Sequence, residues 1–191
     1  MKAPLLLLLA ALLLESCSPG KRLSPNSIPE DSIYQLSSTW KDQTGKEITL
    51  VDLSGRIQIV GLVFTHCIQI CPAIVSDMQA IEKTIPWYRK NQIHFVLLTI
   101  DPARDTPEVL ASYMQKRQLS SERWTLLSGN PADTSDLAAL LGIKVQALPD
   151  GSFAHSRMIT VLNASGQVAF QDPAITDEGR NFLRAAIGAI R

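Results

Sequence analysis

The sequence predicts an α/β domain in which α-helices flank a central mixed β-sheet, with an N-terminal extension and a late β-hairpin. Two observations predict this class. Residues 57–64 and 93–100 are nearly continuous runs of β-branched and apolar side chains, which is the composition of strands buried on both faces. A segment with helical spacing follows each run, and alternating strands and helices are typical of α/β sheets.

The elements before and after the first buried strand are weaker or shorter. Three are expected before it: a strand at 33–40, a turn around Gly45 at 42–46 and an apolar segment at 48–53. After it, residues 73–85 are predicted to be a helix that Pro86 ends, because its apolar residues repeat every three or four positions. These are Ile74, Met78, Ile81 and Ile85.

The second half predicts a helix at 107–118, with Thr106 as its cap and Pro107 at its first position. The remaining expected elements are a strand at 124–127, a helix at 133–141 closed by Gly142, a loop at 147–154, a hairpin made of 158–162 and 168–170, and a terminal helix at 176–190. This order of strands and helices is that of a thioredoxin-like sheet.

Residues 1–16 are expected to be a signal peptide. Lys2 precedes an apolar stretch at 5–14, which is shorter than a helix that spans a bilayer. The following Leu14-Glu15-Ser16-Cys17 is similar to a bacterial lipoprotein cleavage site, so Cys17 is the expected lipidation site and membrane anchor. An ordinary signal peptide or an uncleaved anchor are the alternatives. The protein is then exported and faces the periplasm, from the inner or the outer membrane.

Residues 17–31 hold three prolines, three serines and one glycine and are expected to be a flexible tether, which leaves 32–191 as the domain. Apolar residues make up 46% of the chain, enough for a full core. Lys and Arg together number 18, as do Asp and Glu, and no basic aromatic stripe is present. This balance argues against binding to nucleic acid.

Cys67 and Cys71 are the residues most suited to carry chemistry. They lie where a buried strand passes into a helix, and backbone N–H groups at a helix start favour thiolates, so both thiols are expected to be acidic. Residues four apart on a helix share one side, so the sulfurs can bridge each other or one metal ion. Two thiolates suit a soft ion such as Cu(I), often with imidazole as third ligand.

The chain has three histidines, of which His155 is the best candidate for that third ligand. It follows the expected loop at 147–154, whose end faces the start of the cysteine helix in a thioredoxin-like fold. His66 adjoins Cys67 and is expected to tune the thiolates, and His94 to pack beside a strand. Met78 is expected in the core.

Several motifs together resemble the Sco/SenC family of copper-binding thioredoxin-like proteins, over residues 30–190. They are Phe64-Thr65-His66-Cys67, Cys71-Pro72, Thr99-Ile100-Asp101-Pro102-Ala103-Arg104-Asp105-Thr106-Pro107 and His155-Ser156. The resemblance implies that Cys67, Cys71 and His155 bind copper as Cu(I) or Cu(II). It also implies delivery of copper to the CuA centre in subunit II of cytochrome c oxidase, or reduction of that centre's cysteines.

Two departures from the family pattern stand out. Ile68, Gln69 and Ile70 fill the gap between the cysteines, where family members often have a proline and an acidic residue, and Ala154 precedes the histidine where an aspartate is common. We interpret the segment from Asp101 to Asp105 mainly as a shaped turn and helix cap.

We therefore expect a metallochaperone rather than an enzyme. The alternatives are a thiol–disulfide oxidoreductase that uses Cys67 and Cys71 as its redox pair, and a copper or redox sensor. Expected partners are the copper-receiving protein and other periplasmic copper chaperones or thiol reductases.

Overall fold

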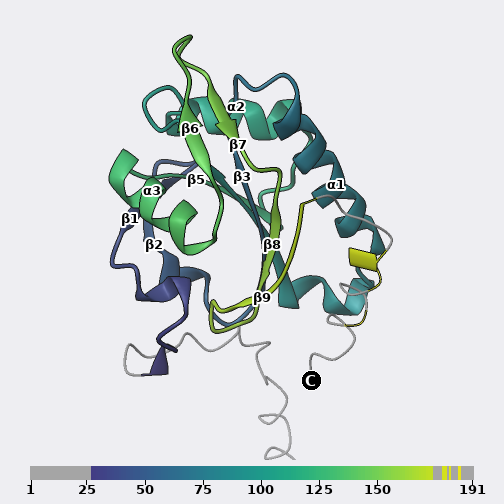
Figure 1. The fold of residues 1–191 in the computed structure, drawn as a ribbon. Helices are drawn as coiled ribbons and strands as arrows, with labels where there is room; N and C mark the ends of the chain where they lie inside the picture. Colours follow the sequence, from purple (N-terminus) through teal and green to yellow (C-terminus); the bar gives the residue numbers. More distant parts are fainter. Residues whose placement is uncertain (1–26, 174–177, 180, 182–184, 186–191) are drawn as a thin grey trace, which may run out of the picture.

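The computed structural model describes residues 27–173 together with residues 178, 179, 181 and 185 (Figure 1). The expected signal peptide, Cys17, and most of the tether and of the terminal helix lie outside the described residues. The expected thioredoxin-like class is confirmed, because helices flank a mixed sheet. Among the described residues, no helix combines the length and the apolar character that crossing a bilayer requires.

The main sheet has seven strands in the order β2-β1-β5-β4-β3-β8-β9. They are β1 (Thr39–Asp42), β2 (Glu47–Thr49), β3 (Ile57–Val63), β4 (Ile93–Thr99), β5 (Trp124–Ser128), β8 (Ile159–Leu162) and β9 (Val168–Asp172). A separate two-stranded sheet consists of β6 (Val145–Ala147) and β7 (Phe153–His155). The helices are α1 (Ile70–Thr84), α2 (Pro107–Lys116) and α3 (Pro131–Leu140), with 3-10 turns η2 (Ile33–Gln35), η3 (Leu50–Leu53) and η4 (Trp87–Gln92).

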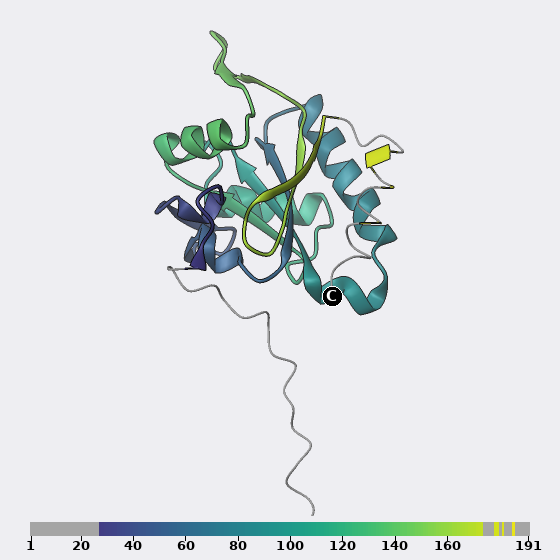
Figure 2. The ribbon, with the colours of Figure 1, turned by 60° about the horizontal axis from the view of Figure 1, so that its bottom comes forward.

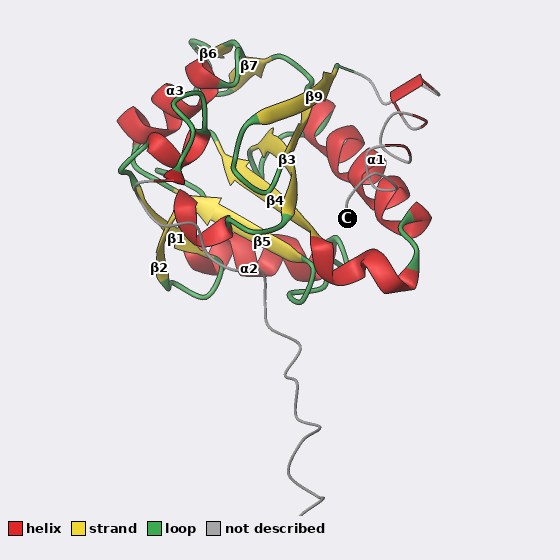
Figure 3. Cartoon of the chain, turned by 90° about the horizontal axis from the view of Figure 1, so that it is seen from below, coloured by secondary structure: helices red, strands yellow, loops and turns green. Residues whose placement is uncertain are grey.

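The core is built on β3, β4 and β5, which run parallel to one another. Every residue of β4 is buried, as is every residue of β3 after its first, which confirms the two strands predicted from their apolar runs. Crossovers between parallel strands are right-handed, so α1 and α2, which connect neighbouring strands in the same direction across the sheet, cover the same face. Figure 3 shows them there, with α3 over the other face.

Close packing of α1 on β3 depends on Gly61. A Cβ atom on this residue would lie 2.9 Å from a methyl carbon of Ile74 and 3.0 Å from the sulfur of Met78. Both side chains are fully buried, so Met78 belongs to the core, as expected. The glycine lets the helix approach the sheet and so fixes the position of its first turn.

Three predicted boundaries were wrong. Residues 33–40 form η2 and only the start of β1, because the Ser32 hydroxyl accepts a hydrogen bond from Tyr34 N–H and starts a 3-10 turn. The expected loop at 147–154 is confirmed at 148–152, but residues 147, 153 and 154 belong to the paired strands β6 and β7, which are too short to show a sequence period. Helix α1 begins at Ile70 rather than at residue 73.

The two ends of the parallel strands carry different features (Figure 2). The cysteine motif follows β3 and the Asp101 turn follows β4, so both lie at the carboxyl ends of the strands. The amino ends carry η4, directly before β4, and the turn between β8 and β9, where Gly55 N–H donates to the Ala164 carbonyl. Ligand sites in open α/β sheets lie at the carboxyl ends.

Candidate metal centre

Cys67 lies in a tight turn between β3 and α1. Its N–H donates to the Phe64 carbonyl at 3.1 Å, and Cys71, the second residue of α1, directs its own N–H at the Cys67 sulfur at 3.3 Å. The cysteines are therefore not two positions of one helix, as the four-residue spacing predicted. The turn folds Cys67 over the helix start, and the sulfurs still come to one side.

The two thiols differ in acidity. Burial raises the pKa of Cys67, but hydrogen bonds from the N–H and thiol of Cys71 and from the N–H groups of Gln69 and Ile70 bring it below its usual value. Burial, the hydrogen bond to Cys67 and the charge on that thiolate raise the pKa of Cys71. The prediction that both thiols are acidic was thus wrong for Cys71, because a second thiolate cannot form cheaply beside the first in a buried site.

The structure brings His155 to the cysteines. Its Nε2 lies 3.4 Å from the Cys71 sulfur, although the two residues are 84 positions apart in sequence. Cys71 is fully buried and His155 nearly so. Phe64 packs edge-on against the His155 ring, with centroids 6.1 Å apart, and its N–H donates to the Cys71 sulfur at 3.4 Å.

The backbone sets the tautomer of His155. Its Nδ1 lies 3.1 Å from the Ser156 carbonyl oxygen, which can only accept, so Nδ1 carries the proton. The Nε2 lone pair then points to Cys71. Burial lowers the pKa of the imidazole, and the hydrogen bond to the Ser156 carbonyl raises it by a smaller amount. The net lowering of the pKa favours the neutral ring. Histidines that bind metals are usually neutral, and a carbonyl or carboxylate that accepts from the other ring nitrogen usually orients them.

These residues fit a soft metal ion. Two donors 3.4 Å apart can share one ion at about 2.0–2.3 Å from each, the bond lengths that nitrogen and sulfur ligands form with zinc. Within the described part of the chain, no three His, Cys, Asp or Glu side chains are already arranged as a metal cage. Binding of one ion through Cys67, Cys71 and His155 together would require these side chains to move closer to one another.

Asp105 fixes the start of the cysteine turn by hydrogen bonds. This fully buried carboxylate accepts hydrogen bonds from the Thr65 N–H at 3.1 Å, the Thr65 hydroxyl and the Thr99 hydroxyl. Thr65 follows β3 and Thr99 ends β4, so one side chain joins the ends of both central strands two residues before Cys67. Its burial shows that Asp105 acts on the turn rather than on a partner surface.

His155 belongs to the hairpin of β6 and β7, which has few ties to the main sheet. Arg104 provides one of them: its guanidinium forms an ion pair with Asp101 and donates to the Gly151 carbonyl near the hairpin tip. Phe153 provides another, through an edge contact with Phe64 at 5.6 Å between centroids.

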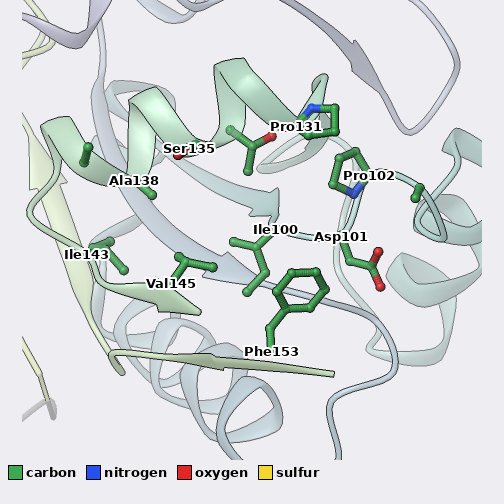
Figure 4. A pocket seen from close by; sticks show the side chains of 12 residues that line it. Ile100, Asp101, Pro102, Pro131, Ser135, Ala138, Ile143, Val145 and Phe153 are labelled. Atoms are coloured by element: carbon green, nitrogen blue, oxygen red, sulfur yellow. The ribbon is translucent and has the colours of Figure 1, made fainter. Parts of the chain in front are cut away.

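A cavity of about 410 Å³ lies between this hairpin and α3 (Figure 4). Val145 and Phe153 line it from the hairpin, while Ala138 and Ile143 line it from α3 and the segment that follows. This pocket is partly open to solvent and lies beside the hairpin that carries His155.

The outer rim of the centre is largely apolar. Ile68 is 88% exposed, and Ile70 is partly exposed beside it. Together with Cys67, Leu148 and His155 they line an open cleft, and Asp150 is the one acidic group among its lining residues. The Ile-Gln-Ile segment between the cysteines therefore forms a surface that a docking partner would contact.

The other two histidines lie outside the centre. The His66 side chain is 58% exposed, with Nδ1 3.2 Å from the Thr65 hydroxyl and 3.9 Å from the Asp105 carboxylate. His94 is buried in β4 and bonds the Thr125 hydroxyl at 2.8 Å, as its expected packing role requires. Burial and the charges of Arg56 and Arg123 lower the His94 pKa to about 4.

Comparison with known proteins identifies the family and the fold. The SCO1/SenC family model matches residues 30–180. A Stutzerimonas stutzeri protein named for copper binding is 30% identical over 143 residues, which are 73% of this chain and 68% of that protein.

Solved structures share the fold. A SCO1/SenC family lipoprotein from Bacillus anthracis superposes with a TM-score of 0.69 and 22% identity over 77% of this chain and 90% of that one. Copper-bound ScoI from Arabidopsis thaliana gives a TM-score of 0.65 and 19% identity over 79% of this chain and 94% of that one. The family match covers most of the sequence and includes both cysteines and His155, so the chain belongs to the SCO1/SenC family.

Proposed function

We propose that this protein is a copper chaperone that binds one copper ion through the Cys67 and Cys71 thiolates and the His155 imidazole. The observation that carries the proposal is the 3.4 Å approach of His155 Nε2 to the Cys71 sulfur, with the ring held neutral and its lone pair directed inward. Family membership and a relative named for copper binding support copper as the ion. A set of two thiolates and one imidazole suits copper, which accepts soft ligands.

The inequality of the cysteines supports release by ligand exchange. Cys67 is partly exposed and its thiolate is the easier one to form, whereas Cys71 and His155 are buried. An incoming thiolate of a partner can therefore bind copper from the open cleft and replace Cys67 first. Replacement of Cys71 and His155 would follow, and the ion would pass on without entering water.

The proposed receiver is the CuA centre in subunit II of cytochrome c oxidase, the client that the family implies. The apolar rim around Cys67, with its exposed Ile68, supports docking of a partner over the cleft. We further propose that the protein is exported and held by a lipid on Cys17, in keeping with the B. anthracis lipoprotein of the same family.

One observation favours a second function. Cys67 is a partly exposed cysteine with a lowered pKa directly beside a second thiol, the arrangement of a dithiol reductase. The Cys67 thiolate would attack a partner disulfide and release one partner thiolate. Cys71 would then attack the mixed disulfide, releasing the second partner thiolate and leaving a Cys67–Cys71 disulfide.

A transfer experiment separates the two functions. The reduced protein, loaded with one equivalent of Cu(I) without oxygen, is mixed with the copper-free, reduced CuA domain of subunit II, and the copper content of each is measured after separation. The proposal predicts movement of copper to the CuA domain, and none from His155→Ala, which would hold little copper. Failure of the reduced protein to retain copper would contradict it. If the copper-free protein instead reduces an oxidised CuA domain, the reductase function is favoured.

A further inference from the structure

An aromatic and basic surface lies at the end of the molecule opposite the metal centre. In η4, Trp87 is 81% exposed and Tyr88 62% exposed, and their rings meet edge to face at 5.8 Å. The other two tryptophans, Trp40 and Trp124, are fully buried in the core. Trp and Tyr are typical of surfaces where an apolar and a wet medium meet.

The charge around this aromatic pair is positive. Lys83, at the end of α1, and Lys90, in η4, are both exposed. The Arg89 guanidinium lies 5.8 Å from the centre of the Tyr88 ring and donates to Gln92. Between residues 83 and 100 the sequence has no Asp or Glu, and Glu82, directly before this stretch, is ion-paired with Arg123. The surface therefore suits a partner that has negative charges on its surface and an apolar layer directly beneath them.

The same end of the molecule receives the N-terminal segment. Ile33 N–H donates to the Gly166 carbonyl in the turn between β8 and β9, at the amino end of β3. Ile57, which begins β3, pairs with Ile93, the residue directly after η4. Figures 1 and 2 agree in placing η4 and the first described residues at one end and the hairpin of β6 and β7 at the other. A strand as long as β4 separates the two ends by about 23 Å.

We propose that Lys83, Trp87, Tyr88 and Lys90 form a membrane-contact surface that seats the domain on an anionic phospholipid bilayer. The two rings would lie at the level of the headgroups, where Trp and Tyr gather in membrane proteins, and the lysines would meet the phosphates. A chain held at the membrane by its N-terminus has a high effective concentration there, so a weak contact suffices. The metal centre would then point away from the bilayer.

This inference goes beyond copper chaperoning and is independent of it. It requires only that the N-terminus keeps the domain near a membrane, and its test involves no copper. The chain offers a built-in probe, because Trp87 is the exposed one of three tryptophans. Subtracting the emission of Trp87→Phe from that of the unaltered protein isolates the signal of this side chain.

The experiment uses the full chain bound to vesicles of phosphatidylcholine and phosphatidylglycerol, with acyl chains that are either plain or brominated. Bromine quenches tryptophan only on close approach, so the Trp87 signal should fall severalfold in brominated vesicles and become resistant to iodide in plain ones. Quenching should weaken in pure phosphatidylcholine, at high salt and in the Lys83→Gln, Lys90→Gln double variant. Leu140→Ser, which alters an exposed apolar residue on α3, is the matched control and should quench like the unaltered protein.

Two results would overturn the inference. One is a Trp87 signal that stays open to iodide and unquenched while the chain remains bound to anionic vesicles, which would assign the surface to a protein partner. The other is equal quenching by anionic and zwitterionic bilayers. Near-ultraviolet circular dichroism of each variant establishes that it is folded.

Discussion

The two halves of the candidate centre are built differently. Cys71 is fully buried at the junction of the central strand β3 and helix α1, and the turn before it is fixed by the buried carboxylate of Asp105. His155 comes from a hairpin outside the main sheet, beside a partly open pocket, and Arg104 links this hairpin to the Asp101 turn. The difference teaches that a metal ion here would join a rigid part of the molecule to a less constrained one.

Such a division suits a protein that has to give up its metal. The cysteine half holds its two sulfurs on one side of a turn, whereas the histidine half lies outside the main sheet and would be the one to move if copper passes to a partner as proposed. The predictions below weaken, one at a time, the cysteine half, the histidine half, the sheet that supports the cysteines and the tie between the Asp101 turn and the hairpin.

The largest effect is expected from Asp105→Ala, which removes the acceptor for three hydrogen bonds beneath the cysteine turn. Leaving these donors buried and unpaired should lower the free energy of unfolding by about 4 kcal/mol. Urea denaturation of the copper-free protein measures this value. Asp105→Asn keeps one acceptor oxygen and should lose about half as much. A loss below ~1 kcal/mol in the alanine variant would show that the turn does not depend on the carboxylate.

The next effect concerns the histidine half. His155→Ala removes one proposed ligand and leaves both cysteines in place. Copper affinity should therefore fall more than ~100-fold, which exceeds the loss caused by removing a residue that only orients a ligand. Competition with a coloured Cu(I) chelator measures the affinity. His94→Gln serves as the control, because this histidine lies outside the centre. Equal affinity in His155→Ala and the unaltered protein would remove His155 from the site.

Acid should weaken the sheet that supports the cysteines. His94 has a pKa of about 4 in the folded protein against an ordinary value of 6.5, so between these pH values the unfolded chain binds the extra proton. Stability is therefore complete above pH 6.5 and declines as the pH falls, by about 2 kcal/mol at pH 5. Urea midpoints measured from pH 7 to pH 5 test this slope. His94→Gln should flatten it, and an unchanged slope in that variant would assign the effect to other groups.

The smallest effect is expected from Arg104→Ala, which cuts the tie between the Asp101 turn and the hairpin that carries His155. Copper affinity should fall by about 10-fold, as is usual when a residue that positions a ligand is removed. The stability of the copper-free protein should change little. Arg104→Lys, which can still donate to one of the two oxygens, should recover part of the loss. Identical affinities in all three proteins would show that the hairpin needs no such tie.

The sequence predicted the centre better than it predicted its support. The buried runs at 57–64 and 93–100 became β3 and β4, and His155, expected after the late loop, lies 3.4 Å from the Cys71 sulfur. Local pattern was sufficient for the strands because apolar composition is a property of neighbouring residues, whereas His155 was singled out by the expected fold.

What the sequence did not predict depends on contacts between distant segments. Asp105 meets Thr65 across 40 positions, and Arg104 meets Gly151 across 47, and the Asp101–Asp105 segment alone indicated only a shaped turn. The unequal pKa values of the cysteines follow from burial, which depends on the folded protein rather than on their spacing. The strands of the hairpin are too short to show a period.

X-ray absorption at the copper edge tests the central claim most directly. The reduced protein with one equivalent of Cu(I) should show two sulfur scatterers and one imidazole nitrogen. His155→Ala, loaded at high protein concentration, should keep both sulfurs and lose the imidazole signal. An unaltered imidazole signal in His155→Ala, or a single sulfur in the unaltered protein, would contradict a centre made of Cys67, Cys71 and His155.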